Sequence, residues 1–158
     1  MASFDIDRGA PAVGQAEIIV NAPPAAVWSV LTAFDDWPRW NGAIQSMQMD
    51  GPLAVGTTFR WRTGGMKIRS QIAVLAAPEV IGWTGVAPLI TARHLYQLTD
   101  LAGRTKVRTR ESFSGLFARL LPGMARQMME KALEDGLALL KTECERRQPP
   151  TGRLPDAA

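Results

Sequence analysis

The only histidine of the chain, His94, lies in a segment rich in β-branched and aromatic residues, Ile90 to Thr99, whose composition is typical of a strand. Glu111 lies in a second segment of this kind, Thr105 to Phe113. Successive side chains of a strand point to opposite faces, and the lysine and arginines that alternate with Glu111 must face water. Glu111 is therefore predicted to point inward, and the same alternation turns His94 to the inside.

A carboxylate and an imidazole that meet in an apolar interior can transfer protons as an acid/base pair. Only the turn residues 100–103 separate the two segments, which predicts a hairpin whose inward side chains lie side by side. The candidate catalytic residues are therefore His94, Glu111 and the inward Tyr96. The same pairing also satisfies two polar groups in an ordinary core, or orients a bound ligand, and the sequence leaves these alternatives open.

The segments that must position these residues are joined by turn-length connections, so neighbouring strands are predicted to be antiparallel. They are Ile44 to Met49, Thr57 to Thr63, Met66 to Leu75, Val80 to Gly85, Ile90 to Thr99 and Thr105 to Phe113. A strand at Ala16 to Asn21 and a helix from Pro24 come first, and Trp37 and Trp40 are predicted to anchor a short helical turn. The last helix, about Pro122 to Arg147, has an apolar face that the concave side of the sheet can bury.

Alternation along the strands also predicts the lining of an internal cavity. This lining is mainly apolar and aromatic with a few polar groups, which is typical of a small-molecule pocket. The expected ligand contacts are Phe59, Trp61, Ile68, Ser70, Ile72, Trp83, Tyr96, Thr109, Met128 and Met129. Val74 and Ile81 are predicted to point inward with them. The methionines of the last helix either form an adaptable lid over the pocket or fill the core.

Four short motifs, in this order, resemble the polyketide cyclase/dehydrase branch of the START-like SRPBCC superfamily. They are Asn21-Ala22-Pro23-Pro24-Ala25-Ala26-Val27-Trp28, Trp37-Pro38-Arg39-Trp40-Asn41, Gly51-Pro52-Leu53-Ala54-Val55-Gly56-Thr57 and Glu111-Ser112-Phe113-Ser114-Gly115, and the resemblance spans residues 16 to 146. It implies an α+β helix-grip fold: a curved antiparallel sheet of about seven strands around a long C-terminal helix, with two short helices after the first strand.

The same resemblance implies a function for the cavity. It points to binding of a small hydrophobic ligand, such as a lipid or a polyketide-like aromatic. In an enzyme of this family it points instead to proton abstraction and dehydration, here by His94, Glu111 and Tyr96. Folds of this kind serve carriers and enzymes alike, so both functions remain open.

The net charge of +3 permits an anionic partner without requiring one. Eight basic residues are predicted to share the convex face of the sheet: Arg60, Arg62, Lys67, Arg69, Arg93, Lys106, Arg108 and Arg110. An interaction protein that binds a membrane surface, an acidic protein or RNA through this face is the third functional hypothesis, and a simple solvated face explains the charges equally well. No aromatic residues are interleaved with the cations, and no DNA partner is expected.

The composition predicts one domain over residues 14–147, with a flexible segment at 1–13 and a flexible proline-rich tail at 148–158. No apolar run suggests a signal peptide or a membrane span, so a cytoplasmic location is expected. The single cysteine, Cys144, has no partner for a disulfide or a zinc site. Nucleotide-binding and metal-binding motifs are not found in the sequence, and no cofactor is expected.

Overall fold

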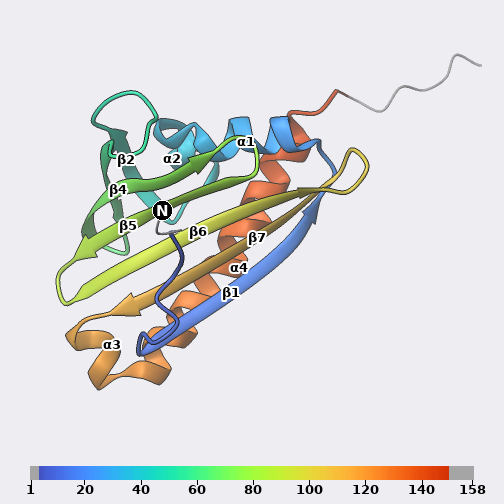
Figure 1. The fold of residues 1–158 in the computed structure, drawn as a ribbon. Helices are drawn as coiled ribbons and strands as arrows, with labels where there is room; N and C mark the ends of the chain where they lie inside the picture. The colour runs from blue at the N-terminus through green and yellow to red at the C-terminus, as the bar shows by residue number, and fades with distance from the viewer. Residues whose placement is uncertain (1–3, 150–158) are drawn as a thin grey trace, which may run out of the picture.

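The structure is a computed structural model that describes residues 4–149. Its seven strands form one antiparallel sheet in the order β1-β7-β6-β5-β4-β3-β2 (Figure 1). The strands are β1 (Ala12–Val20), β2 (Ile44–Met49), β3 (Thr58–Thr63), β4 (Met66–Ala76), β5 (Val80–Ala87), β6 (Ile90–Asp100) and β7 (Thr105–Ser114). The helices are α1 (Pro24–Thr32), the 3-10 turn η1 (Phe34–Asp36), α2 (Trp37–Trp40), α3 (Leu116–Leu120) and α4 (Pro122–Arg146). This arrangement confirms the predicted α+β helix-grip fold and adds α3, which the sequence did not predict.

Helix α4 lies along the inner face of the sheet, mainly against β1 (Figure 1). Gly14 allows the close approach, because a Cβ built there would lie 2.9 Å from the sulfur of Met129. Near the other end of the helix, the Lys141 ammonium donates to the Ile19 carbonyl at 2.6 Å. The helix is therefore fixed to one strand along its length. Among the described residues, no helix is long and apolar enough to span a membrane.

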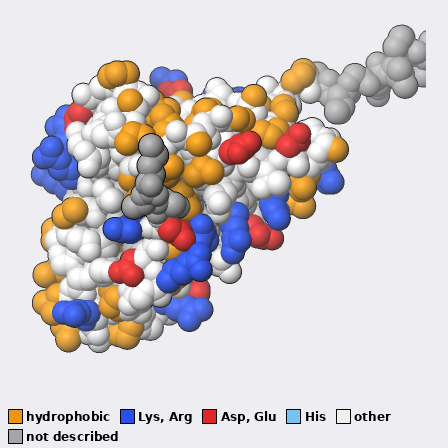
Figure 2. Space-filling view, in the orientation of Figure 1, with side chains coloured by type: hydrophobic (Ala, Val, Ile, Leu, Met, Phe, Trp, Pro, Cys, Tyr) orange, Lys and Arg blue, Asp and Glu red, His pale blue; other side chains and the backbone are white. Residues whose placement is uncertain are grey.

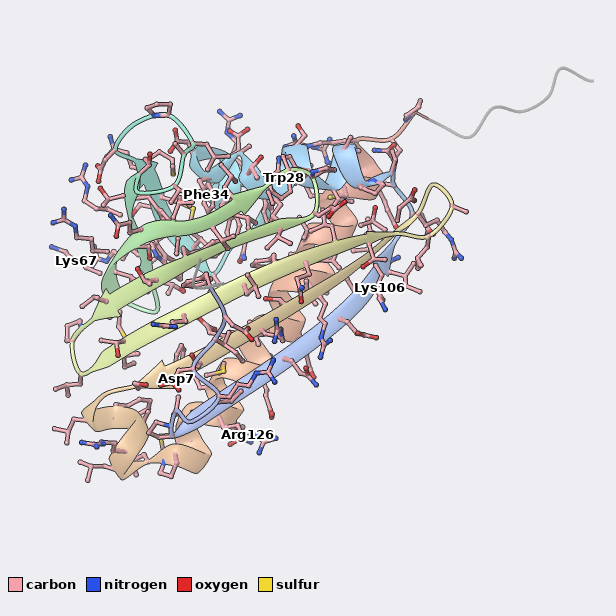
Figure 3. All side chains as sticks on the ribbon, viewed as in Figure 1. Asp7, Trp28, Phe34, Lys67, Lys106 and Arg126 are labelled. Atoms are coloured by element: carbon pink, nitrogen blue, oxygen red, sulfur yellow. The ribbon has the colours of Figure 1, made fainter. Side chains whose placement is uncertain are left out.

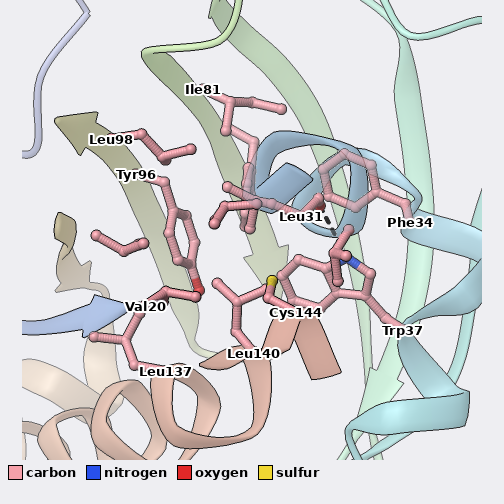
Figure 4. Packing of buried hydrophobic residues seen from close by; sticks show 14 of the residues in the cluster. Val20, Leu31, Phe34, Trp37, Ile81, Tyr96, Leu98, Leu137, Leu140 and Cys144 are labelled. Atoms are coloured by element: carbon pink, nitrogen blue, oxygen red, sulfur yellow. Dashed lines mark hydrogen bonds between the residues drawn. The ribbon is translucent and has the colours of Figure 1, made fainter. Parts of the chain in front are cut away.

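Two apolar clusters divide the core between the sheet and the helices. The larger one, here called the aromatic cluster, includes Phe34, Trp37, Phe59, Trp83, Tyr96, Leu137, Leu140 and Cys144. Figure 4 shows Phe34, Trp37, Tyr96, Leu137, Leu140 and Cys144 of this cluster. Within it, the Trp37 indole donates to the Leu31 carbonyl at 3.0 Å, so the buried tryptophan is also fixed by a hydrogen bond. The smaller one, here called the helix cluster, consists of Ala12, Ala118, Ala125, Met129 and Leu133, with Phe113 and Phe117 packed against it.

A bulge in β4 corrects one predicted inward residue. The pairing of β4 with β5 shifts between Ile72 and Val74, so the alternation changes phase there. Val74 consequently pairs with Gly82, while Leu75 pairs with Ile81 and packs against the aromatic cluster. The prediction that Val74 points inward is wrong, because simple alternation cannot anticipate the extra residue of a bulge.

The segment before β1 packs on the outer face of the sheet. Ile6 is buried, the backbone N–H of Asp7 donates to the Ser112 hydroxyl at 3.0 Å, and Asp5 pairs with Arg110 at 3.1 Å. Strand β1 begins at Ala12, four residues before the predicted start at Ala16. The mobility predicted for residues 1–13 stays a prediction, and the contacts of Asp5, Ile6 and Asp7 argue against it. Residues 1–3 and most of the predicted tail, 150–158, lie outside the described residues.

Candidate functional site

Strands β6 and β7 place His94 and Glu111 directly opposite each other in the register of the hairpin. Both face inward, and the His94 Nδ1 lies 3.5 Å from the Glu111 Oε1. The other ring nitrogen, Nε2, is 2.7 Å from the Thr109 hydroxyl oxygen. The sequence predicted this inward juxtaposition, while the contact with Thr109 emerges only from the structure.

Two aromatic rings pack against the imidazole of His94 and hold it in place. The His94 ring lies 4.7 Å from the Tyr96 ring with an interplanar angle of 24°, and 4.8 Å from the Trp83 ring with an angle of 48°. Tyr96 and Trp83 in turn stack at 5.6 Å. The imidazole is thus packed on one side of the sheet with its nitrogens directed to Thr109 and Glu111. A fixed ring orientation suits both an acid/base group and a ligand anchor.

Burial determines the charge state of this pair. It raises the pKa of Glu111 to about 8 and lowers the pKa of His94 to about 3, since each group loses solvation of its charged form. Burial also raises the pKa of Tyr96 well above its ordinary value, and the nearby Glu111 adds to this effect. At neutral pH the site therefore contains a neutral imidazole beside a carboxylic acid, rather than an ion pair. The carboxylic acid is a proton donor, and the imidazole is a proton acceptor.

A row of small residues crosses the inner face beside this pair. Ser70 pairs with Gly85, Gly85 pairs with Ala92, and Ala92 pairs with Phe113. This row is adjacent to the row that contains Trp83, His94 and Glu111. A Cβ built at Gly85 would be 3.4 Å from the Ser70 hydroxyl and 3.7 Å from the Ala92 Cβ, an ordinary packing distance. On β4, β5 and β6, the inner face of the sheet therefore carries only small side chains in the row next to the polar pair.

The polar pair lies at the boundary between the two apolar clusters. Along β6, the next inward residue after His94 is Tyr96, which belongs to the aromatic cluster. Along β7, the next inward residue after Glu111 is Phe113, which packs against the helix cluster. The side chains of His94 and Glu111 remain 11% and 12% exposed, so some access from the solvent persists. A ligand with an apolar body and one polar group matches such a boundary.

The predicted ligand contacts fall into three groups. Fully packed in the core are Phe59, Ser70, Ile72, Trp83, Tyr96, Thr109 and Met129. Trp61 and Ile68 are half-buried, and the Trp61 indole donates to the Ser70 hydroxyl at 3.0 Å. Met128 is 42% exposed on α4 and lies outside both clusters. Gly85, Ala92 and Phe117 were not predicted from the sequence; only the inward alternation of β5 and β6 could have indicated the first two.

Residues 12–145 match the family described as polyketide cyclase/dehydrase and lipid transport. No curated protein gave a match. Among solved structures, a hypothetical protein from Helicobacter pylori superposes with a TM-score of 0.77 at 17% identity, covering 91% of this chain and 99% of that chain.

Two further structures show the same fold. The Zhui aromatase/cyclase from Streptomyces sp. R1128 superposes with a TM-score of 0.73 at 20% identity, covering 90% of this chain and 98% of that chain. A START superfamily protein from Mycobacterium smegmatis superposes with a TM-score of 0.75 at 15% identity, covering 86% of this chain and 99% of that chain. At such identities the likeness establishes the fold and leaves the ligand open.

Proposed function

We propose that this chain, which belongs to the polyketide cyclase/dehydrase and lipid transport family, binds a small hydrophobic molecule between the inner face of its sheet and helix α4. One observation carries the proposal: a buried polar pair, His94 and Glu111, lies at the boundary of two apolar clusters beside a row of small side chains. Apolar surface on both sides would drive binding at roughly 25 cal/mol per Å² buried. The pair would fix the orientation of one hydroxyl or carbonyl group of the ligand.

The apolar body of the ligand is expected to lie over Gly85 and Ala92, next to Ser70, whose hydroxyl already accepts the Trp61 indole N–H at 3.0 Å. Gly85 and Ala92 add little side-chain volume above the strands, and Trp61 and Phe117 are half-buried. A lipid chain or a polyketide-like aromatic has the apolar surface that such a lining favours. The packed residues of the aromatic cluster, including Phe59 and Ile72, would form the floor rather than the walls of this site.

Substitutions on the two faces of β6 test the location of the ligand. Ala92→Phe would fill the space above the row of small residues, whereas Thr91→Phe places the same ring on the exposed opposite face. Binding would be followed with 8-anilinonaphthalene-1-sulfonate fluorescence, and native mass spectrometry of the purified protein would identify a co-purifying molecule. We expect Ala92→Phe to lose at least tenfold in probe affinity and Thr91→Phe to lose nothing. Equal loss in both variants, or in neither, would contradict the proposed location.

A second function, catalysis of a cyclase/dehydrase type, is favoured by the juxtaposition of the imidazole and the carboxyl group in the same pair. Burial keeps Glu111 protonated at neutral pH, because it raises the pKa of this carboxyl to about 8. In a dehydration, the Glu111 carboxyl would give its proton to a hydroxyl that leaves as water. The neutral His94 would take a proton from the adjacent carbon as the new C=C bond forms. A proton transfer from His94 to Glu111 would then restore the starting state.

Gln variants separate the binding function from the catalytic one. His94→Gln and Glu111→Gln keep approximate shape and hydrogen bonding but remove the capacity to exchange protons. A carrier should retain ligand affinity within a few-fold in both variants. An enzyme should still bind its substrate, yet lose turnover by about 10²-fold or more. Product analysis by mass spectrometry with any co-purified molecule as substrate would decide between them.

A further inference from the structure

Exposed apolar side chains gather at one end of the molecule. Among the described residues, seven of the ten large apolar side chains that are exposed lie at the end of β5, in the β5–β6 turn, and in the segment from the start of α3 to the first turns of α4. We call them the apolar tip: Val86, Leu89, Leu116, Leu120, Leu121, Met124 and Met128. Leu120 is 69% exposed and Leu89 is 63% exposed, values that no packing requirement of the fold explains.

Three chain segments that come together at this end are free of acidic residues. Residues 60–69, 84–93 and 114–128 contain none of the 15 acidic residues of the chain. They contain seven of its 18 basic residues: Arg60, Arg62, Lys67, Arg69, Arg93, Arg119 and Arg126. These three segments therefore place only basic residues among the ionisable residues of the chain stretches that carry the exposed apolar side chains.

Specific contacts join the three segments. Arg69 of β4 pairs with Val86 of β5, and the backbone N–H of Phe117 in α3 donates to the Leu89 carbonyl at 3.3 Å. Gly115 packs closely there as well, since a Cβ on it would lie 2.6 Å from the Leu89 oxygen. Figure 1 shows α3 and the β5–β6 turn at the same end of the sheet. Figure 2 shows apolar side chains over this end with basic groups beside them.

A hollow of about 800 Å³ lies on the outer face next to the apolar tip. Its lining includes Arg60, Arg62, Lys67, Arg69, Val86 and Pro88. Arg60 pairs with Asp50 at 2.9 Å. Within residues 4–149, no carboxylate lies within 4.0 Å of Arg62, Lys67, Arg69 or Arg119, and we call these four cations the basic flank. Figure 3 shows Lys67 projecting at the edge of the molecule.

From this arrangement we propose that the apolar tip and the basic flank dock the protein on an anionic lipid bilayer. The apolar side chains would enter the boundary between headgroups and acyl chains, and the cations would bind anionic headgroups. The apolar residues come from a turn tip, a short helix and a helix start. A membrane surface can accept such separate projections without a matching shape, whereas a protein partner would need a complementary pocket for each. The inference does not depend on whether the inner site binds a ligand.

Vesicle flotation of the full-length protein tests this docking. The probes are phosphatidylcholine vesicles and vesicles of phosphatidylcholine with about one-third phosphatidylglycerol. We expect binding to the anionic vesicles only, and a decline as the salt concentration rises from about 0.05 to 0.5 M. Lys67→Glu with Arg119→Glu should weaken this binding at least tenfold, because each lost cation corresponds to about fivefold. Leu120→Ser with Met124→Ser should also weaken it, by about tenfold.

Matched control variants change the same residue types elsewhere on the surface. Arg104→Glu with Lys106→Glu reverses two cations at the β6–β7 hairpin, and Figure 3 shows Lys106 at the opposite end of the sheet. Val55→Ser with Leu139→Ser removes two exposed apolar side chains outside the apolar tip. Each control should reduce binding to the anionic vesicles by twofold at most.

Three results would overturn the proposal. The first is no binding of the wild type to anionic vesicles at low salt. The second is an equal loss of binding in the test variants and in the controls. The third is a loss with Lys67→Glu and Arg119→Glu but none with Leu120→Ser and Met124→Ser. That last pattern would indicate that the surface binds a soluble polyanion such as RNA and not a bilayer. Competition of RNA with the vesicles for the protein would test this alternative. Circular dichroism of each variant ensures that a loss does not reflect unfolding.

Discussion

The imidazole of His94 and the carboxyl of Glu111 face each other across two adjacent antiparallel strands, with Nδ1 3.5 Å from Oε1. Burial opposes charge on either group and keeps both neutral at pH 7. A proton donor and a proton acceptor thus lie side by side in a largely apolar interior. The titration and the stability of the protein should therefore both depend on this pair, whatever the ligand.

Because His94 is the only histidine of the chain, its imidazole gives a unique signal in nitrogen-15 NMR spectra. Its pKa is lowered from 6.5 to about 3 by burial, so the ring should remain neutral from pH 8 down to pH 5. The nitrogen shifts should therefore show one protonated and one unprotonated ring nitrogen throughout this range. Protonation with a midpoint near 6.5 would show that the ring is solvated like a free imidazole and would contradict the buried acid/base pair.

Glu111 should make the protein less stable as the pH rises. The folded-state pKa of Glu111 is raised from 4.5 to about 8, so the folded state binds more protons than the unfolded state between these values. His94 has the opposite effect below pH 6.5, where protonation favours the unfolded state. Of these two groups, only Glu111 still affects the stability between pH 6.5 and 8. The free energy of unfolding should fall there by up to about 2 kcal/mol.

Urea denaturation of Glu111→Gln measures this effect. The variant cannot ionise at residue 111, so the fall in unfolding free energy between pH 6.5 and 8 should be largely abolished. Glu17→Gln, on the exposed side of β1, is the matched control and should keep the wild-type slope. An unchanged slope in Glu111→Gln would show that another group causes the pH dependence.

The short connection before α3 depends on Gly115. This residue has a φ of 104°, and a Cβ on it would lie 2.6 Å from the Leu89 carbonyl oxygen. Gly115→Ala should lower the free energy of unfolding by at least about 2 kcal/mol. Gly136→Ala, in the middle of α4 with no atom within 4 Å of the added methyl, should raise it by roughly 0.5–1 kcal/mol. Thermal and urea denaturation of both variants would check these opposite signs.

The N-terminal segment should contribute to stability although the sequence suggested a loose end. Ile6 is buried on the outer face, where Leu95 is also buried. Ile6→Ala should therefore lower the free energy of unfolding by about 2 kcal/mol, since it removes buried apolar surface. Arg8→Ala, whose side chain is 76% exposed, should change it by less than about 0.5 kcal/mol. Equal small effects would indicate that residues 1–13 are mobile, as the sequence predicted.

Much of this fold follows from local patterns in the sequence. Turn residues delimit the strands, and alternation orients His94 and Glu111 because β6 and β7 pair without a bulge. The bulge in β4 depends on pairing with β5, which no local pattern reveals, and so Val74 was misplaced. The burial of Ile6 was missed for a similar reason, since its partners lie far along the chain. Alternation identifies which face a residue occupies, but packing decides whether space remains there.

A hydrophobic molecule bound at the proposed position on the inner face would be in contact with His94. The single imidazole can report this directly during a titration with 8-anilinonaphthalene-1-sulfonate, or with a co-purifying molecule if one is found. Binding in the proposed site should shift the His94 ring nitrogen signals in wild type and in Thr91→Phe, but not in Ala92→Phe. Saturable binding that leaves the His94 signals of the wild type unchanged would place the ligand elsewhere and contradict the proposed site.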